Sequence, residues 1–164
     1  IGCTFVQCFL FGVFFHFHDA LPKGEQYVKT EIPGSISTKN MYTTVDKKEE
    51  LEALGGYLTQ NHLTEKKVLL YGEIPAISYI FDMEPAVYTT WADLRSNTLE
   101  RLQADLDAIT TDYPVVIVTD AIGQELSGNT SYVDEKLDAI AQFLSRGNYQ
   151  CGYAQKGYYV YTSQ

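Results

Sequence analysis

Two short apolar runs, separated by segments with helical periodicity, constrain the fold of this chain most strongly. The run Val68 to Tyr71 ends at Gly72-Glu73, and the run Val115 to Thr119 is apolar up to its last residue, as in a strand that is covered on both faces. Helical segments lie before, between and after these runs. This alternation predicts right-handed crossovers and a mainly parallel sheet.

Three segments have apolar residues at the spacing of an amphipathic helix. The first begins at Asp46, a candidate N-cap that is followed three residues later by Glu49, as in a capping box. Gly55-Gly56 costs this helix about 1 kcal/mol per glycine relative to alanine, so we expect the pair to pack closely against a strand. The second helix begins at Asn97, and the third runs from Ser131 to Gly147.

Further strands are expected in the middle of the chain and at both ends. Tyr149 to Tyr153 and Tyr158 to Tyr161 flank a turn and predict an antiparallel hairpin at the edge of the sheet. Ala86 to Thr89 predicts one more strand. At the N-terminus, the alternation of apolar residues in 9–17 and the segment Gln26 to Ile32 predict a strand pair.

These elements predict one α/β domain over residues 1–164: a three-layer, mainly parallel, Rossmann-like sheet with a C-terminal antiparallel edge hairpin and an N-terminal strand pair. The formal net charge is -9, and no cluster of basic residues is longer than the pairs Lys47-Lys48 and Lys66-Lys67. A nucleic-acid partner is therefore excluded, because binding to phosphates needs a basic stripe. The 13 Tyr and 8 Phe favour either extensive sheet or an adhesive face.

A ligand of an open α/β sheet binds beyond the carboxyl ends of the parallel strands. Glu73 and Asp120 follow two such strands and could form a carboxylate pair that binds a cation or shares a proton; alternatively, each caps the segment that follows it. Tyr79, Tyr88 and Trp91 lie near strand ends and could provide a stacking surface, although a place in the core is the alternative.

The sequence contains no complete catalytic motif, so we expect no catalytic residue. Neither GxGxxG nor GxxxxGK[ST] occurs, and Glu73 at the start of the first crossover would repel a phosphate, so no cofactor is expected. No Ser lies in GxSxG. Cys3, Cys8 and Cys151 are expected to be buried free thiols in apolar strands, and one disulfide between two of them is the alternative.

His16 and His18 lie on one side of the expected first strand. With a third ligand they could bind a metal, and with Asp120 they would suit a divergent metal-dependent hydrolase. The alternative is that both are surface residues of a solvated strand face.

The stretch from Gly72 to Phe81, followed by Thr89 to Leu94, resembles the soluble C-terminal domain of bacterial multi-span glycosyltransferase-like membrane proteins of the dolichyl-phosphate-mannose protein mannosyltransferase type. The likeness extends from about Phe15 to the end and includes Phe17-His18-Asp19 and Tyr42-Thr43-Thr44.

The resemblance implies an accessory, non-catalytic domain on the extracytoplasmic face of the cell membrane. It would assist docking of an acceptor or a lipid-linked sugar, with the membrane-embedded part of the same polypeptide as its partner. The family's catalytic acid lies in a loop between early spans, so no catalytic residue transfers to this chain. The start at Ile1 without Met agrees with a piece of a larger membrane protein. A free-standing saccharide-binding or small-molecule-binding module is the alternative.

Overall fold

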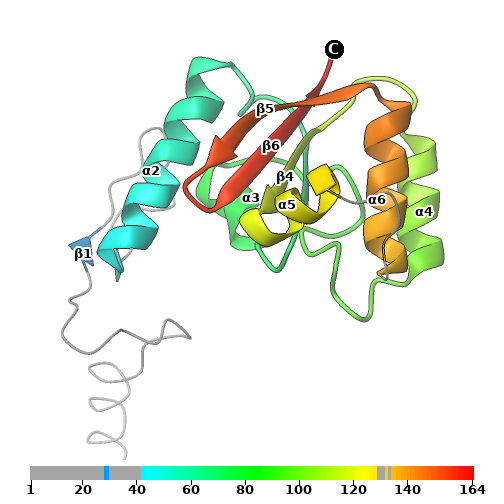
Figure 1. Cartoon of the computed structure of the whole chain (residues 1–164), viewed down its shortest axis with the longest axis horizontal. Helices are drawn as coiled ribbons and strands as arrows, with labels where there is room; N and C mark the ends of the chain where they lie inside the picture. The colour runs from blue at the N-terminus through cyan, green and yellow to red at the C-terminus, as the bar shows by residue number, and fades with distance from the viewer. Residues whose placement is uncertain (1–27, 30–41, 129–131, 133) are drawn as a thin grey trace, which may run out of the picture.

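The computed structural model describes residues 28–29, 42–128, 132 and 134–164 and is a mixed α/β fold (Figure 1). Its elements in chain order are β1 (Val28–Lys29), β2 (Tyr42–Thr43), α2 (Val45–Gln60), β3 (Val68–Tyr71), α3 (Ala76–Ile80), α4 (Leu99–Ala108), β4 (Val115–Thr119), α5 (Asp120–Gly128), α6 (Glu135–Arg146), β5 (Tyr149–Gln155) and β6 (Tyr158–Ser163). In this part of the chain, no helix has the length and apolar character needed to cross a bilayer.

The main sheet has four strands in the order β3-β4-β6-β5, and only β3 and β4 are parallel. The predicted C-terminal hairpin is confirmed as β5 and β6, with β6 next to β4 and β5 at the edge. The prediction of a mainly parallel sheet is therefore wrong. A hairpin joined by a short turn can only add antiparallel strands, and here it supplies half of the sheet.

The strand predicted at 86–89 is absent. Segment 84–86 instead makes one isolated parallel bridge, in which Val68 N–H donates to the Glu84 carbonyl and Ala86 N–H to the Val68 carbonyl, both at 2.8 Å. Pro85 is the bridging residue, and its missing N–H removes a donor from any longer ladder. The chain beyond it turns away from β3 toward α4.

Helices cover both faces of the sheet because successive strand residues enter opposite apolar clusters. Val68 and Leu70 pack in the cluster beneath α2 and α3, whereas Leu69 and Tyr71 pack in the cluster beneath α4 and α6. The central strand β4 is buried at all of its first four residues. Full burial of one such side chain contributes about 1.5–3 kcal/mol, so the two clusters are the main source of stability.

A β-bulge between Cys151 and Tyr153 divides β5 between the two clusters. Residues four apart on a regular strand share a face, but the extra residue Gly152 turns Tyr153 toward α2 while Tyr149 packs on the α4–α6 side. A Cβ at Gly152 would lie 2.3 Å from the Tyr57 hydroxyl oxygen, so a larger residue here would require the Tyr57 side chain to move.

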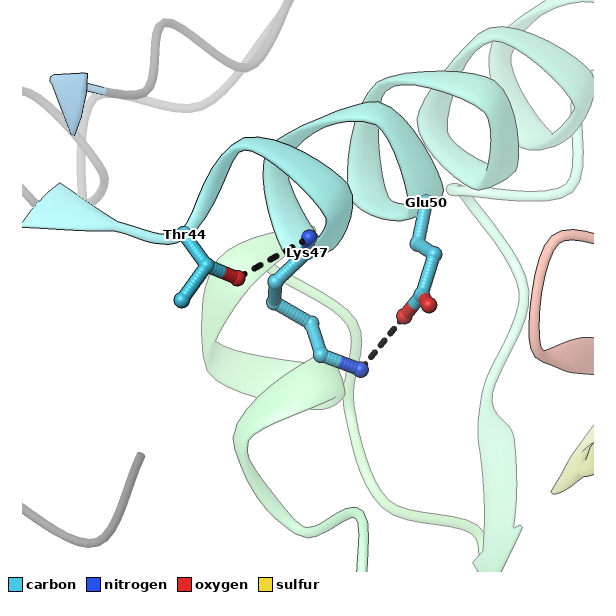
Figure 2. Close-up of polar contacts among 3 residues, drawn as sticks. All are labelled: Thr44, Lys47 and Glu50. Carbon is cyan, nitrogen blue, oxygen red and sulfur yellow. Dashed lines mark hydrogen bonds and ion pairs between the residues drawn. The ribbon is translucent and has the colours of Figure 1, made fainter. Parts of the chain in front are cut away.

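The predicted helices exist, but their caps differ from those expected. Thr44 caps α2, with its Oγ1 accepting from the Lys47 N–H at 3.2 Å (Figure 2). Asp46 lies inside the first turn instead. Thr98 rather than Asn97 caps α4, and Asp134 rather than Ser131 caps α6. Several Ser, Thr, Asp and Asn residues precede each apolar stripe, and the spacing alone did not distinguish among them.

The tip of the β5–β6 hairpin is docked on the N-terminal half of α2. Lys156 (φ 49°) and Gly157 (φ 80°) form a two-residue turn with positive φ at both positions, which matches the twist of the strands. The Lys156 ammonium pairs with Glu49 at 3.0 Å, and a Cβ on Gly157 would meet the Glu50 carboxyl group at 3.3 Å. Glu50 in turn pairs with Lys47 (Figure 2).

The helix α5 was not anticipated from the sequence. It begins directly at Asp120, and a Cβ at Gly123 would lie 2.2 Å from the Tyr159 ring, so this glycine lets the helix rest on β6. By contrast, nothing lies within 4 Å of a Cβ at Gly56, so the expected close packing does not explain that glycine.

At the N-terminal end, β1 and β2 form a short antiparallel pair. The strand predicted at 26–32 is described only at Val28–Lys29, which pairs with Tyr42–Thr43, whereas its predicted pairing with segment 9–17 stays a prediction. The latter segment lies outside the described residues.

Candidate functional site

The carboxyl ends of β3 and β4 lie side by side, as predicted from the sequence. Tyr71 pairs with Val118, and a Cβ at the next residue, Gly72 (φ +105°), would lie 2.4 Å from the Thr119 Oγ1. Only glycine fits this close approach and this backbone conformation. The chain therefore leaves both strands at one edge, which carries Glu73 and Asp120. We call this the carboxyl edge.

The two carboxylates at this edge have different surroundings. Asp120 is the first residue of α5, where its Oδ2 accepts a 2.6 Å hydrogen bond from Gln124 Nε2. Its N–H donates to the Gly157 carbonyl at 2.9 Å, which ties β4 to the hairpin turn. Glu73 is exposed, has φ 60°, and its N–H donates to Asp93 Oδ2 at 2.7 Å. A ligand-binding role for this pair stays a prediction.

The hydrogen bond between Glu73 and Asp93 brings the loop that carries Trp91 to the carboxyl edge. Trp91 is 37% exposed, and its N–H donates to Thr89 Oγ1 at 3.1 Å. The next residue, Ala92, is fully buried, and its carbonyl accepts from Asn97 Nδ2 at 2.9 Å. The indole is thus presented to solvent by a backbone that is anchored on both sides.

The two tyrosines predicted for the same surface contact different elements: Tyr79 lies on α3, and Tyr88 contacts α4. Tyr88 is 70% exposed, but the Arg101 guanidinium lies 3.5 Å from its ring centroid and occupies one face of the ring. Its N–H donates to Asp105 Oδ2 of α4 at 2.9 Å. Tyr79 is 64% exposed on α3, which packs in the opposite apolar cluster. Tyr79 and Tyr88 are thus held by different elements, and a stacking surface shared with Trp91 stays a prediction.

A buried phenol, Tyr71, ends β3 among carboxylates and was not predicted from the sequence as part of a site. The Tyr71 hydroxyl donates to Asp134 Oδ2 at 2.6 Å. Burial raises the pKa of Tyr71 strongly, and the hydrogen bond to Asp134 and the charges of Asp93 and Glu125 add to this. These acids come from three separate segments, so no spacing in the sequence could have grouped them. Within the described residues, no three His, Cys, Asp or Glu side chains are arranged to hold a metal ion.

The histidines and two cysteines proposed from the sequence, His16, His18, Cys3 and Cys8, lie outside the described residues. The third cysteine, Cys151, is exposed on the edge strand β5, so its predicted burial is wrong. Partial burial of its sulfur nevertheless raises the pKa of the thiol, and the Sγ donates to the Tyr153 carbonyl at 3.3 Å.

Two adjoining pockets, of about 260 and 290 Å³, lie at the opposite end of the parallel strands. They are lined by residues just before β3, just before β4 and at the end of α4, and they share Lys67 and Asp112. This groove was not predicted from the sequence, whose candidate binding residues follow the carboxyl ends of the strands.

Comparison with known proteins yields no relative. No protein-family model matches the chain, and neither the curated proteins nor the solved structures include one similar to it. The geometry described above is therefore the basis for proposing a binding site.

Proposed function

We propose that this chain is a non-catalytic binding domain that recognises a saccharide, free or lipid-linked, at the carboxyl edge. The observation that carries the proposal is the 2.7 Å hydrogen bond between the Glu73 N–H and Asp93, which places the Trp91 loop beside the carboxylates of Glu73 and Asp93. An exposed aromatic ring next to hydrogen-bond acceptors is suited to sugars, which have apolar ring faces and hydroxyl donors.

The fixed backbone around Trp91 favours such a role. Ala92 is buried and Asn97 holds its carbonyl, so the ring is presented without ordering a flexible loop on binding. Less conformational entropy is then lost when the ligand binds. The Glu73 and Asp93 carboxylates would accept hydrogen bonds from sugar hydroxyls at the margin of the ring.

Trp91 is the single tryptophan of the chain, so tryptophan fluorescence reports on this site alone. Titration with mannose, glucose and short mannosides should give a saturable change in emission, weakened by Glu73→Gln and Asp93→Asn. Glu52→Gln on α2 is the matched control and should leave the titration unchanged. A flat titration with every saccharide at millimolar concentration would contradict the proposal.

The cellular context remains part of the proposal and rests on the resemblance of Gly72 to Phe81 and Thr89 to Leu94. The domain would be the extracytoplasmic part of a glycosyltransferase-like membrane protein and would assist its membrane-embedded part. The pairing of β3 with β4 and the helices on both sides of the sheet also support a distant relation to Rossmann-like folds. Protease accessibility of the domain in intact cells tests the context, and protection from external protease would exclude it.

A further inference from the structure

The groove at the amino ends of β3 and β4 has a charged half and an apolar half. Glu65, Lys66, Lys67 and Asp112 line the charged half together with the ring of Tyr113. The other half continues past Lys67 and Asp112 to apolar side chains that include Ala86 and Ile109. We call this the amino-end groove. It is separate from the carboxyl edge, because it lies at the other end of the same parallel strands.

The two lysines of the groove have no anionic partner within the described part of the chain. They are exposed, and neither forms an ion pair with Glu65 or Asp112. Within residues 42–164, each of the four lysines outside the groove has an acceptor: Lys47 with Glu50, Lys48 with Glu52, Lys156 with Glu49 and Lys136 with the Leu94 carbonyl. In a chain with net charge -9, two adjacent unpaired ammonium groups beside a pocket are available to an anion.

The walls of the groove are held by contacts outside it. The Lys67 carbonyl accepts from the Val115 N–H at 2.9 Å, which fixes the start of β3 against β4. The Tyr113 ring packs 5.9 Å from Phe143 and edge-on at 6.0 Å from Tyr149, centroid to centroid. The Tyr149 hydroxyl donates to the Pro114 carbonyl at 2.8 Å. The groove is therefore preorganised, which lowers the entropic cost of binding.

We propose that the amino-end groove binds a zwitterion of amino-acid size with an apolar side chain. Its carboxylate would pair with the ammonium groups of Lys66 and Lys67, and its ammonium group with the Asp112 carboxylate. Its side chain would lie against Ala86 and Ile109. A ligand with several negative charges is disfavoured, because Glu65 and Asp112 would repel it. The two volumes, about 260 and 290 Å³, leave room for such a molecule.

Leucine is the probe that tests the proposal, with chemical shifts of the backbone amides as the readout. We expect leucine at millimolar concentration to shift the amides of Lys66, Asp112 and Tyr113. Lys67→Gln and Asp112→Asn should each weaken binding about tenfold, which corresponds to the loss of one charged contact. Asn is chosen because Asp112 has φ 50°, a conformation that asparagine tolerates. Lys48→Gln on α2 is the matched control and should bind as the wild type does.

Three analogues separate the parts of the ligand. 4-Methylpentanoate lacks the ammonium group, leucinamide lacks the carboxylate, and glycine lacks the apolar side chain; each should bind more weakly than leucine. If leucine shifts none of the groove amides, or if both groove variants bind it unchanged, the proposal is wrong. Equal binding of 4-methylpentanoate and leucine would overturn the zwitterion assignment.

Discussion

The Tyr71 hydroxyl, at the end of β3, donates a 2.6 Å hydrogen bond to Asp134, the N-cap residue of α6. The Tyr71 residue is only 2% exposed, while Asp134 lies at the surface and also accepts from the Lys136 N–H at 2.9 Å. One carboxylate thus caps a helix and anchors it to the sheet. The bond joins two segments that are 63 residues apart.

Tyr71→Phe should destabilise the fold by about 1–2 kcal/mol, because it removes a hydrogen bond to a charged group while Asp134 remains hydrated. Urea denaturation measures the change in the free energy of unfolding. Tyr88→Phe is the control: its ring is 70% exposed, so the effect should be close to zero. Equal stability of Tyr71→Phe and the wild type would mean that the bond does not hold α6 to the sheet.

Stability should fall as the pH rises above about 10, the ordinary pKa of tyrosine. Burial is the first cause that raises the pKa of Tyr71, Tyr149 and Tyr158, so the folded state disfavours their phenolates. A tyrosine whose pKa is higher in the folded than in the unfolded state stabilises the fold while it is protonated. This contribution has its full value below the pKa of the unfolded state and is lost as the pH rises through the pKa of the folded state.

Urea denaturation over a pH series from neutral to alkaline checks this dependence. Tyr149→Phe should reduce the slope of the free energy of unfolding against pH, because one phenol with a raised pKa is removed. A slope that is unchanged in this variant would show that other groups dominate the alkaline loss of stability.

Gly72→Ala should cost about 1–3 kcal/mol, because alanine is strained at φ +105° and its Cβ would lie 2.4 Å from the Thr119 Oγ1. Gly56→Ala is the matched control, since its Cβ meets nothing within 4 Å inside α2 and should stabilise the fold by about 0.5–1 kcal/mol. Thermal unfolding of both variants tests the pair. Adding Thr119→Ala to Gly72→Ala should recover part of the loss, and no recovery would argue against the contact.

The sequence predicts that Asp46 caps α2, whereas the structure shows that Thr44 does, and substitutions of the two residues distinguish these alternatives. Thr44→Ala should cost about 1 kcal/mol, because Thr44 Oγ1 accepts from the Lys47 N–H. Asp46→Ala should cost less, about 0.3–1 kcal/mol, because Asp46 acts only on the helix dipole. Thr44→Ser keeps the acceptor and should recover most of the stability. A larger loss from Asp46→Ala than from Thr44→Ala would favour the cap predicted from the sequence.

Several elements were predictable because their signals are local. The strands Val68–Tyr71 and Val115–Thr119 coincide with the apolar runs, and the hairpin follows from two Tyr-rich runs around Lys156-Gly157. The strand predicted at 86–89 is absent, because Pro85 and its bridge to Val68 determine the conformation of that segment. The helix α5 was not predicted, because its packing depends on the tertiary contact between Gly123 and Tyr159.

The candidate site was predictable only in part. Glu73 and Asp120 were placed correctly at one edge, because residues that follow parallel neighbouring strands must share it. The approach of Asp93 to Glu73 and of Asp134 to Tyr71 joins segments 20 and 63 residues apart, and no local spacing encodes such contacts. The attachment of Tyr79 to α3 and of Tyr88 to α4, on opposite sides of the sheet, is likewise not encoded by local spacing.

By itself, the sequence determined where the apolar strands and amphipathic helices lie, because these depend on periodicity and on contacts between near neighbours. Only the tertiary structure decided the order β3-β4-β6-β5, the face on which each tyrosine packs, and which polar groups meet at each end of the sheet. The physical reason is that strand pairing and close packing optimise the burial of the whole chain. One inserted residue, Gly152, was enough to send Tyr149 and Tyr153 to opposite sides.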